Sequence, residues 1–165
     1  MIISISSTPP VDTTELAKEL AEENGLTVIG DPAPSVCRDF GFQTLYDMPD
    51  VLQLEIRERL IFDHLELVST RTGVLLNFSV FQYLADWMRW FWTNTPTEKW
   101  DEITSAASDC AKLYDRVYHV EVGPRRAYDG YVWFDRLNAE QISTLMKGLY
   151  ADFEIADKLF ISQTK

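Results

Sequence analysis

Long apolar runs, cysteine and positive charge are all scarce in this sequence of 165 residues. No apolar run reaches the roughly 20 residues that a membrane-spanning helix needs, so we expect no association with a membrane. The N-terminus has neither a basic region nor a long apolar stretch, and we therefore expect no signal peptide and a cytoplasmic location. The two cysteines, Cys37 and Cys110, predict reduced thiols in that compartment, with a disulfide between them as the alternative.

The shortage of positive charge narrows the choice of partners. Lysine and arginine number 15 against 26 acidic residues, which gives a net charge of −11. Such a chain repels a polyanion unless its basic residues gather on one face, and Arg125–Arg126 is the only adjacent basic pair. We therefore expect no binding to nucleic acid, while mimicry of nucleic acid by an acidic surface stays as an alternative.

Histidine is scarce too, with only His64 and His119. Neither has a second histidine or a cysteine at metal-binding spacing, so we expect no metal site. We interpret His64 as a polar residue of a helix and expect His119 to fill one face of a strand. No catalytic Ser-His-Asp or Cys-His set can be assembled from local spacing, and G-x-S-x-G is missing.

What the chain does contain is a regular alternation of strand-type and helix-type patterns. Hydrophobic residues make up 46% of the sequence, enough for the core of one domain over residues 1–165. Strands are expected at residues 2–6, 26–30, 74–78, 116–122 and 158–162, and helices at 13–23, 50–68, 79–92, 97–114 and 138–153. This order predicts an α/β fold of three layers, αβα, around a mainly parallel sheet. The inner side of helix 50–68 is expected to hold Val51, Leu54, Leu60, Ile61 and Leu65.

The first strand-to-helix connection, "STPPVDTT", lies where a nucleotide enzyme would have its phosphate-binding loop. The pattern G-x-x-x-x-G-K-[ST] falls on residues 7–14, from Ser7 to Thr14, and only Thr14 matches it. Pro10 has no N–H to donate, Asp12 places a carboxylate among the phosphate positions, and Thr13 replaces the lysine. The alternative interpretation is an ordinary turn followed by a helix capped by Asp12 or Thr13.

Other segments extend the comparison along the chain. "IISIS" with "ELAKELAEENGLTVIGDPA", then "VCRDFGF", "VLLNFSVFQYLADW" and "YDRVYHVEVGPRRAYDGYVWFD", resemble P-loop nucleotide kinases in order and spacing. More narrowly, the chain resembles the small thymidylate-kinase-like and nicotinamide-riboside-kinase-like ATPases of bacteria and their phages. The resemblance implies a P-loop nucleotide-kinase-like fold with a lid-like loop near residues 123–136.

The departures from that family fall on residues that would handle phosphate. Asn77 and Phe78 stand at an Asp-Arg position, Gln82 stands at an aspartate, and Val132 stands at the lid arginine. The scaffold residues Tyr83, Leu84 and Gly130 match the family pattern. The resemblance therefore implies a vestigial pocket, whose positions are Asp31, Asn77, Gln82, Arg125 and Arg126.

The stretch "WMRWFW" is dense in aromatic residues. Trp87, Trp90, Phe91 and Trp92 spread around most of a helical turn, so one buried face cannot hide all four rings. Tryptophan is enriched in interface hot spots, and the four form a candidate interface for a protein partner or a homodimer. The alternative is a core position with partial exposure.

Three functional hypotheses follow. The one favoured by the sequence is a catalytically inactive kinase-like protein that acts through a protein partner and, if it comes from a phage, regulates or inhibits a host protein. It needs no cofactor. The second is a divergent active nucleoside or nucleotide kinase using Mg-ATP, with Asp31 orienting the acceptor, Thr14 holding magnesium, and Arg125, Arg126 or Lys18 replacing the missing cation. The third is a non-catalytic protein that binds a nucleoside through Thr13, Asn77 and Gln82.

Overall fold

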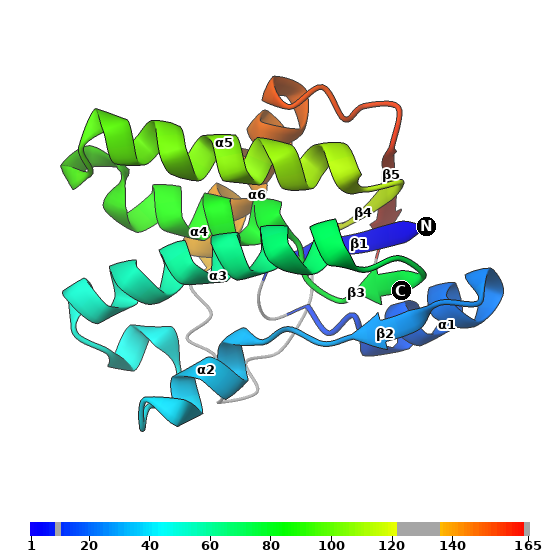
Figure 1. The fold of residues 1–165 in the computed structure, drawn as a ribbon, viewed down its shortest axis with the longest axis horizontal. Coiled ribbons are helices and arrows are strands. Elements are labelled where there is room, and N and C mark those ends of the chain that lie inside the picture. The colour runs from blue at the N-terminus through cyan, green and yellow to red at the C-terminus, as the bar shows by residue number, and fades with distance from the viewer. Residues whose placement is uncertain (9–10, 122–135, 164–165) are drawn as a thin grey trace.

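The computed structural model describes residues 1–8, 11–121 and 136–163. Five parallel strands form one sheet in the order β2-β3-β1-β4-β5 (Figure 1). Every neighbouring pair runs parallel, from Thr27 opposite Val74 at one edge to Val117 opposite Leu159 at the other. The bounds are β1 Ile2–Ser7, β2 Thr27–Ile29, β3 Val74–Leu76, β4 Arg116–Glu121 and β5 Leu159–Gln163.

In the described part of the chain, six α-helices connect and cover these strands. They are α1 Thr14–Asn24, α2 Ala33–Asp39, α3 Asp50–Thr70, α4 Val80–Phe91, α5 Thr97–Leu113 and α6 Arg136–Asp152, with short 3-10 turns η1 Leu45–Asp47 and η2 Trp92–Asn94. The arrangement confirms the predicted three-layer α/β fold with a parallel sheet. The sequence did not predict α2 or η1, because α2 is short, starts at a proline-rich turn and buries only Cys37.

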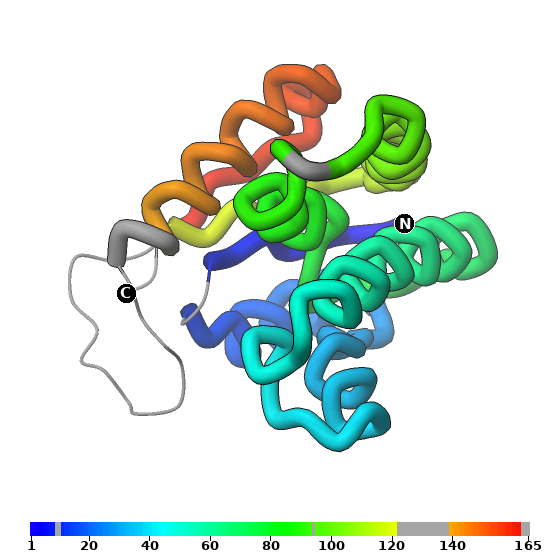
Figure 2. The backbone as a smooth tube through the Cα atoms, turned by 90° about the vertical axis from the view of Figure 1, so that its left-hand side faces the viewer, coloured from blue at the N-terminus to red at the C-terminus, as the bar shows by residue number. Residues whose placement is uncertain are grey.

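The two faces of the sheet are covered unequally. On one face, α1 packs Ala17 and Leu20 against Ile3 and Ile5 of β1. On the other face, α3, α4, α5 and α6 build the larger core. The tube view shows α4 in the middle of this layer, between α3 and α6 (Figure 2). Strand β1 is buried on both faces, and its sequence IISISS combines three buried isoleucines with three buried serines, of which Ser4 donates to the Phe78 carbonyl at 2.8 Å.

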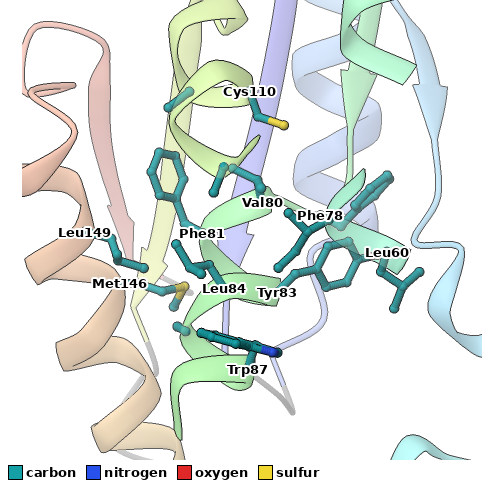
Figure 3. Close-up of a cluster of buried hydrophobic side chains, with 14 of the residues drawn as sticks. Leu60, Phe78, Val80, Phe81, Tyr83, Leu84, Trp87, Cys110, Met146 and Leu149 are labelled. Carbon is teal, nitrogen blue, oxygen red and sulfur yellow. The ribbon is translucent and has the colours of Figure 1, made fainter. Parts of the chain in front are cut away.

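Helix α4 forms the centre of the larger core. Ser79 caps its N-terminus, because the Ser79 Oγ accepts a hydrogen bond from the Gln82 N–H at 3.1 Å. Phe81 and Leu84 turn toward Met146 and Leu149 of α6 (Figure 3). Trp87 is completely buried and stacks on Trp100 of α5, with ring centroids 5.2 Å apart. The prediction that Trp87 belongs to an interface is therefore wrong, because its ring lies in the core.

Two further side chains differ from expectation. Val51, predicted on the inner side of its helix, is exposed, because it lies on the outer side of the first turn of α3, whose Leu52 packs against the core; Leu60 and Ile61 are buried as predicted. His64 was interpreted as a polar helix residue, but it is buried, and its Nε2 lies 2.5 Å from the Tyr114 hydroxyl. The apolar spacing of α3 continues through His64, so this position turns inward.

Other expectations agree with the structure. His119 is buried on one face of β4, where its Nδ1 lies 2.9 Å from the Tyr150 hydroxyl. Cys37 and Cys110 are buried free thiols. Among the described helices, none combines the length and apolarity that crossing a membrane requires.

Candidate functional site

The carboxyl ends of β1, β2 and β3 bring together most of the residues singled out in the sequence. Ser7 ends β1, Asp31 follows β2 by two residues, and Asn77 directly follows β3. In parallel α/β sheets this edge is where ligands bind, because the strand ends and the starts of the following helices face a common space. The edge has two parts, a loop side at the start of α1 and a pocket side between α2 and α4.

On the loop side, several described polar groups bond one another, whereas the buried Thr8 hydroxyl has no hydrogen-bond partner in the described part of the chain. The Thr13 hydroxyl donates to Asn77 Oδ1 at 2.5 Å, joining the loop to the end of β3. The Asp12 carboxylate accepts the Thr14 N–H at 2.9 Å, and the Val11 N–H donates to the Thr8 carbonyl at 3.0 Å. Of the backbone N–H groups that a phosphate loop would turn toward its ligand, those of Val11 and Thr14 are thus paired inside the loop.

The start of α1 carries its own negative charge. Asp12 lies just before the helix and Glu15 lies in its first turn. Carboxylates at this end of a helix interact favourably with its dipole, at the place where a phosphate would otherwise bind. Asp12 makes the capping contact that the sequence allowed, whereas Thr13 makes no side-chain cap bond. Lys18, considered as a substitute cation, pairs with Glu15 at 2.7 Å on the exposed surface of α1.

Behind the loop, β1 is tied to the start of α4 by serine and glutamine side chains. The Ser6 hydroxyl donates to Ser79 Oγ at 2.6 Å, and the Ser7 N–H donates to Gln82 Oε1 at 3.5 Å. Phe78 is buried, with its ring 4.9 Å from that of His64. Phe78 stands where the nucleotide-kinase family that this sequence resembles has an arginine. Its ring therefore lies in the core and not on the surface of the site.

On the pocket side, Asp31 is held in place by two donors. The Tyr83 hydroxyl donates to Asp31 Oδ1 at 2.5 Å, and the Ala33 N–H donates to the same oxygen at 2.8 Å. Burial, reinforced by the negative charge of Asp31, raises the pKa of Tyr83 well above its usual value, so the hydroxyl stays protonated and donates. Within the described ranges Asp31 Oδ2 has no hydrogen-bond partner, which leaves it for a ligand.

Asp31 opens onto a pocket of about 250 Å³ between α2, η1, α4 and one residue of α6. The walls are mostly apolar, and Tyr46 and Tyr83 supply two aromatic rings. The convergent polar side chains come from Asp31, Gln43, Thr44, Gln82 and Asp86. No lysine or arginine belongs to the described lining. A mostly apolar pocket with a few polar groups is the usual form of a small-molecule site.

Asp86 is fixed from behind the pocket by a buried arginine. Arg57 of α3 is almost completely buried, and its Nε donates to Asp86 Oδ2 at 2.6 Å. The Tyr46 hydroxyl donates to Asp86 Oδ1 at 3.2 Å, and the Arg57 guanidinium lies 5.5 Å from the Tyr46 ring centroid. Because Arg57 neutralises Asp86, Asp31 is the carboxylate of the pocket without a described cationic partner.

The structure thus brings together Ser7, Asp12, Thr13, Thr14 and Asn77 on the loop side, and Asp31 and Gln82 on the pocket side. Arg125, Arg126 and the predicted lid-like loop lie outside the described residues, apart from position 136. Trp90 and Trp92 are exposed at the end of α4 and in η2, whereas Phe91 is half-buried. No cluster of three or more potential metal ligands occurs in the described ranges.

Sequence reasoning missed Arg57, Asp86 and Tyr46. Arg57 carried a weak signal, because Gln53 precedes it by one helical turn, and the Arg57 Nη1 donates to Gln53 Oε1 at 3.1 Å. Asp86 stands in an otherwise apolar stretch, "YLADWM", where a charge needs a partner. Tyr46 lies in a segment without periodicity, and nothing in the sequence placed its ring at a pocket.

Comparisons with known proteins show the fold. No protein-family model matches the chain, and no curated protein matches it in sequence. Two solved structures align with 97% of this chain: the NadR protein in complex with NR, at a TM-score of 0.68 and 11% identity, and the NadR protein in complex with NAD and AMP-PNP, at 0.64 and 14%. The chain spans 43% of the length of each NadR chain. At this level of identity, the likeness confirms the P-loop nucleotide-kinase-like fold alone.

Proposed function

We propose that this protein has a nucleotide-kinase-like fold without phosphoryl transfer, and that its pocket binds a neutral, nucleoside-type ligand. The observation that carries the proposal is the contrast between the two sides of the site. On the loop side Asp12 accepts the Thr14 N–H and Thr13 donates to Asn77, whereas on the pocket side Asp31 faces a cavity.

The loop side opposes phosphate in two ways. A bound phosphate would have to displace Asp12 from the Thr14 N–H, and it would lie close to the Asp12 charge. Two unit charges about 4 Å apart repel by roughly 1–4 kcal/mol between water-like and surface-like surroundings. Phosphoryl transfer depends on positioning and charge neutralisation by lysine, arginine and magnesium. At the lysine position stands Thr13, which is bonded to Asn77.

The pocket side suits a ligand with hydroxyls and a flat ring. Asp31 Oδ2 can accept a hydroxyl, and the rings of Tyr46 and Tyr83 offer apolar contact to a heterocycle. Gln43 and Gln82 add amide groups that can donate and accept. A ligand bearing phosphate would meet Asp31 without a compensating cation in the described lining. That one NadR structure holds NR supports a nucleoside-type ligand here.

A matched set of nucleosides and their 5′-monophosphates tests the proposal. We expect at least one nucleoside to bind, with ¹H–¹⁵N chemical-shift changes at Asp31, Tyr46 and Gln82, and its monophosphate to bind at least tenfold more weakly. Asp31→Asn should weaken nucleoside binding, whereas Asp39→Asn, in the same helix–loop region, should leave it unchanged. Tighter binding of the monophosphate, or shifts confined to residues 11–14, would contradict the proposal.

A protein partner, which the sequence favours, remains a second candidate function. The exposed rings of Trp90 and Trp92 support it, together with Tyr46, whose ring centroid lies 6.2 Å from that of Trp90. A host-directed regulator would use such a surface. Affinity capture with the unchanged protein and with a Trp90→Ala, Trp92→Ala variant tests this: a genuine partner is lost from the variant, and a partner retained by both would contradict this surface.

A further inference from the structure

Strand β5 forms an edge of the sheet that no described strand covers. It pairs with β4 along one side only, with Val117 opposite Leu159 and His119 opposite Ile161. The opposite edge of the sheet is β2, which has 3 residues against the 5 of β5. An edge strand presents a row of backbone groups that can pair with another strand.

The register identifies which backbone groups point outward. The Val117 N–H donates to the Lys158 carbonyl at 2.9 Å. In a parallel ladder, a residue bonds to the two neighbours of the residue opposite it, so Val117 engages Lys158 and Phe160. The alternate residues, Leu159 and Ile161, therefore direct their N–H and C=O groups away from β4.

The side chains of β5 are unusually apolar for an exposed edge. Phe160 is 43% exposed and Ile161 is 64% exposed, and the alternation along a strand places them on opposite faces. Phe160 stacks on Tyr118 of β4 with ring centroids 5.1 Å apart, which holds its ring against the sheet. Soluble proteins usually protect such edges with charges, prolines or bulges, and the segment Leu159–Gln163 has neither charge nor proline.

The absence of charge in β5 bears on what can cover it. With a net charge of −11, two copies of this chain repel each other over most of their surfaces. Two β5 strands can approach without bringing like charges into register. A two-fold axis through the edge makes the strands antiparallel and the contact self-complementary, because the same patch serves both copies.

We propose that β5 pairs with β5 of a second copy of this chain, in antiparallel register about a two-fold axis at Ile161. The two copies of Ile161 exchange backbone hydrogen bonds, and each Phe160 lies opposite a Ser162. The pairing joins the two sheets into one continuous sheet and removes both apolar edges from water. This inference does not depend on the proposed ligand site.

Light scattering coupled to size exclusion, over a range of protein concentrations, tests the proposal. We expect a dimer of about 38 kDa, twice the chain mass of 19.0 kDa, and its conversion to monomer by Ile161→Lys. Val28→Lys is the matched control, since Val28 is 42% exposed on the opposite edge strand and its replacement should leave the dimer intact. Circular dichroism verifies that both variants fold.

Amide hydrogen exchange on the unchanged protein supplies a second measurement that needs no variant. We expect exchange at Ile161 to slow as the protein concentration rises, while exchange at Val28 does not change. A monomer at all concentrations would overturn the proposal. So would a dimer that survives Ile161→Lys but is lost with Trp90→Ala, because that result places the contact at the tryptophans.

Discussion

At the scale of single residues, the site depends on a few short polar contacts between segments far apart in the sequence. Asp31 and Tyr83 are separated by 52 positions, and Thr13 and Asn77 by 64. The first bond joins the loop after β2 to α4, and the second joins the residue before α1 to the residue after β3, so each fixes the shape of the site as well as its charge. A buried or half-buried hydrogen bond of this type contributes about 1 kcal/mol, and more when one partner is charged.

Tyr83→Phe tests one of these contacts. The variant keeps the ring and removes the hydroxyl that donates to Asp31, so we expect the free energy of unfolding to fall by about 1–2 kcal/mol. Urea unfolding measures this change. Tyr118→Phe is the control, because the Tyr118 ring stacks on Phe160 and no described residue bonds its hydroxyl; its change should stay within about 0.5 kcal/mol. If Tyr83→Phe and Tyr118→Phe lowered the free energy of unfolding equally, the assigned role of Tyr83 would be wrong.

At the scale of elements, one wall of the pocket is held in place by an ion pair between two helices. Arg57 of α3 is buried, and it is neutralised by Asp86 of α4 and held by Gln53 one turn earlier. Such a pair adds little to the free energy of unfolding compared with apolar packing of the same volume. Removing one member is costly, however, because it leaves a buried charge without a partner. The Arg57–Asp86 pair therefore fixes the relative position of α3 and α4 next to the pocket.

Asp86→Ala should lower the free energy of unfolding by about 3–5 kcal/mol, because Arg57 is then buried and unpaired. The double variant Arg57→Met, Asp86→Leu should recover most of that loss. Glu58→Ala serves as the control: it removes an ion pair between α3 and α5 whose cation, Lys99, is 35% exposed where Arg57 is 1% exposed, so the cation left behind stays hydrated and we expect a change below about 1 kcal/mol. Denaturant unfolding of the unchanged protein and the three variants measures these free energies and checks their order. If Asp86→Ala lowered the free energy of unfolding as little as Glu58→Ala does, the assigned role of the Arg57–Asp86 pair would be wrong.

Elements with clear periodicity could be predicted from the sequence, whereas contacts between elements could not. The expected strand at 2–6 is observed as Ile2–Ser7, and the expected helix at 50–68 as Asp50–Thr70. Helix α2 was missed because it has no repeating apolar positions. The pairs Thr13–Asn77 and Arg57–Asp86 depend on tertiary packing, which local pattern does not encode. Asp31 and Gln82 were singled out by a family resemblance, not by spacing.

At the scale of the whole molecule, two buried histidines make stability depend on pH. Burial lowers the pKa of His64 from 6.5 to about 3 and that of His119 from 6.5 to about 4. Both are neutral in the folded protein, while the unfolded chain binds protons below pH 6.5. Their contribution is complete above pH 6.5 and is lost progressively as the pH falls toward 4 and 3.

At pH 5 each neutral histidine should lower the free energy of unfolding by about 2 kcal/mol relative to pH 7. Urea unfolding between pH 7 and pH 5, a range above the titration of most carboxylates, measures this slope. A His64→Gln variant, which does not titrate there, should lose about half of it. The same slope in the variant and the unchanged protein would show that His64 is not the source.

For the whole molecule, we propose that a nucleotide-kinase-like fold is present without a working phosphate site. Isothermal titration of the protein with Mg-ATP, at protein concentrations high enough to reveal millimolar binding, is the measurement to make first. We predict no detectable heat, because the Asp12 carboxylate occupies the Thr14 N–H and Thr13, at the lysine position, donates to Asn77. Micromolar binding of Mg-ATP would contradict the claim and would restore the active-kinase alternative.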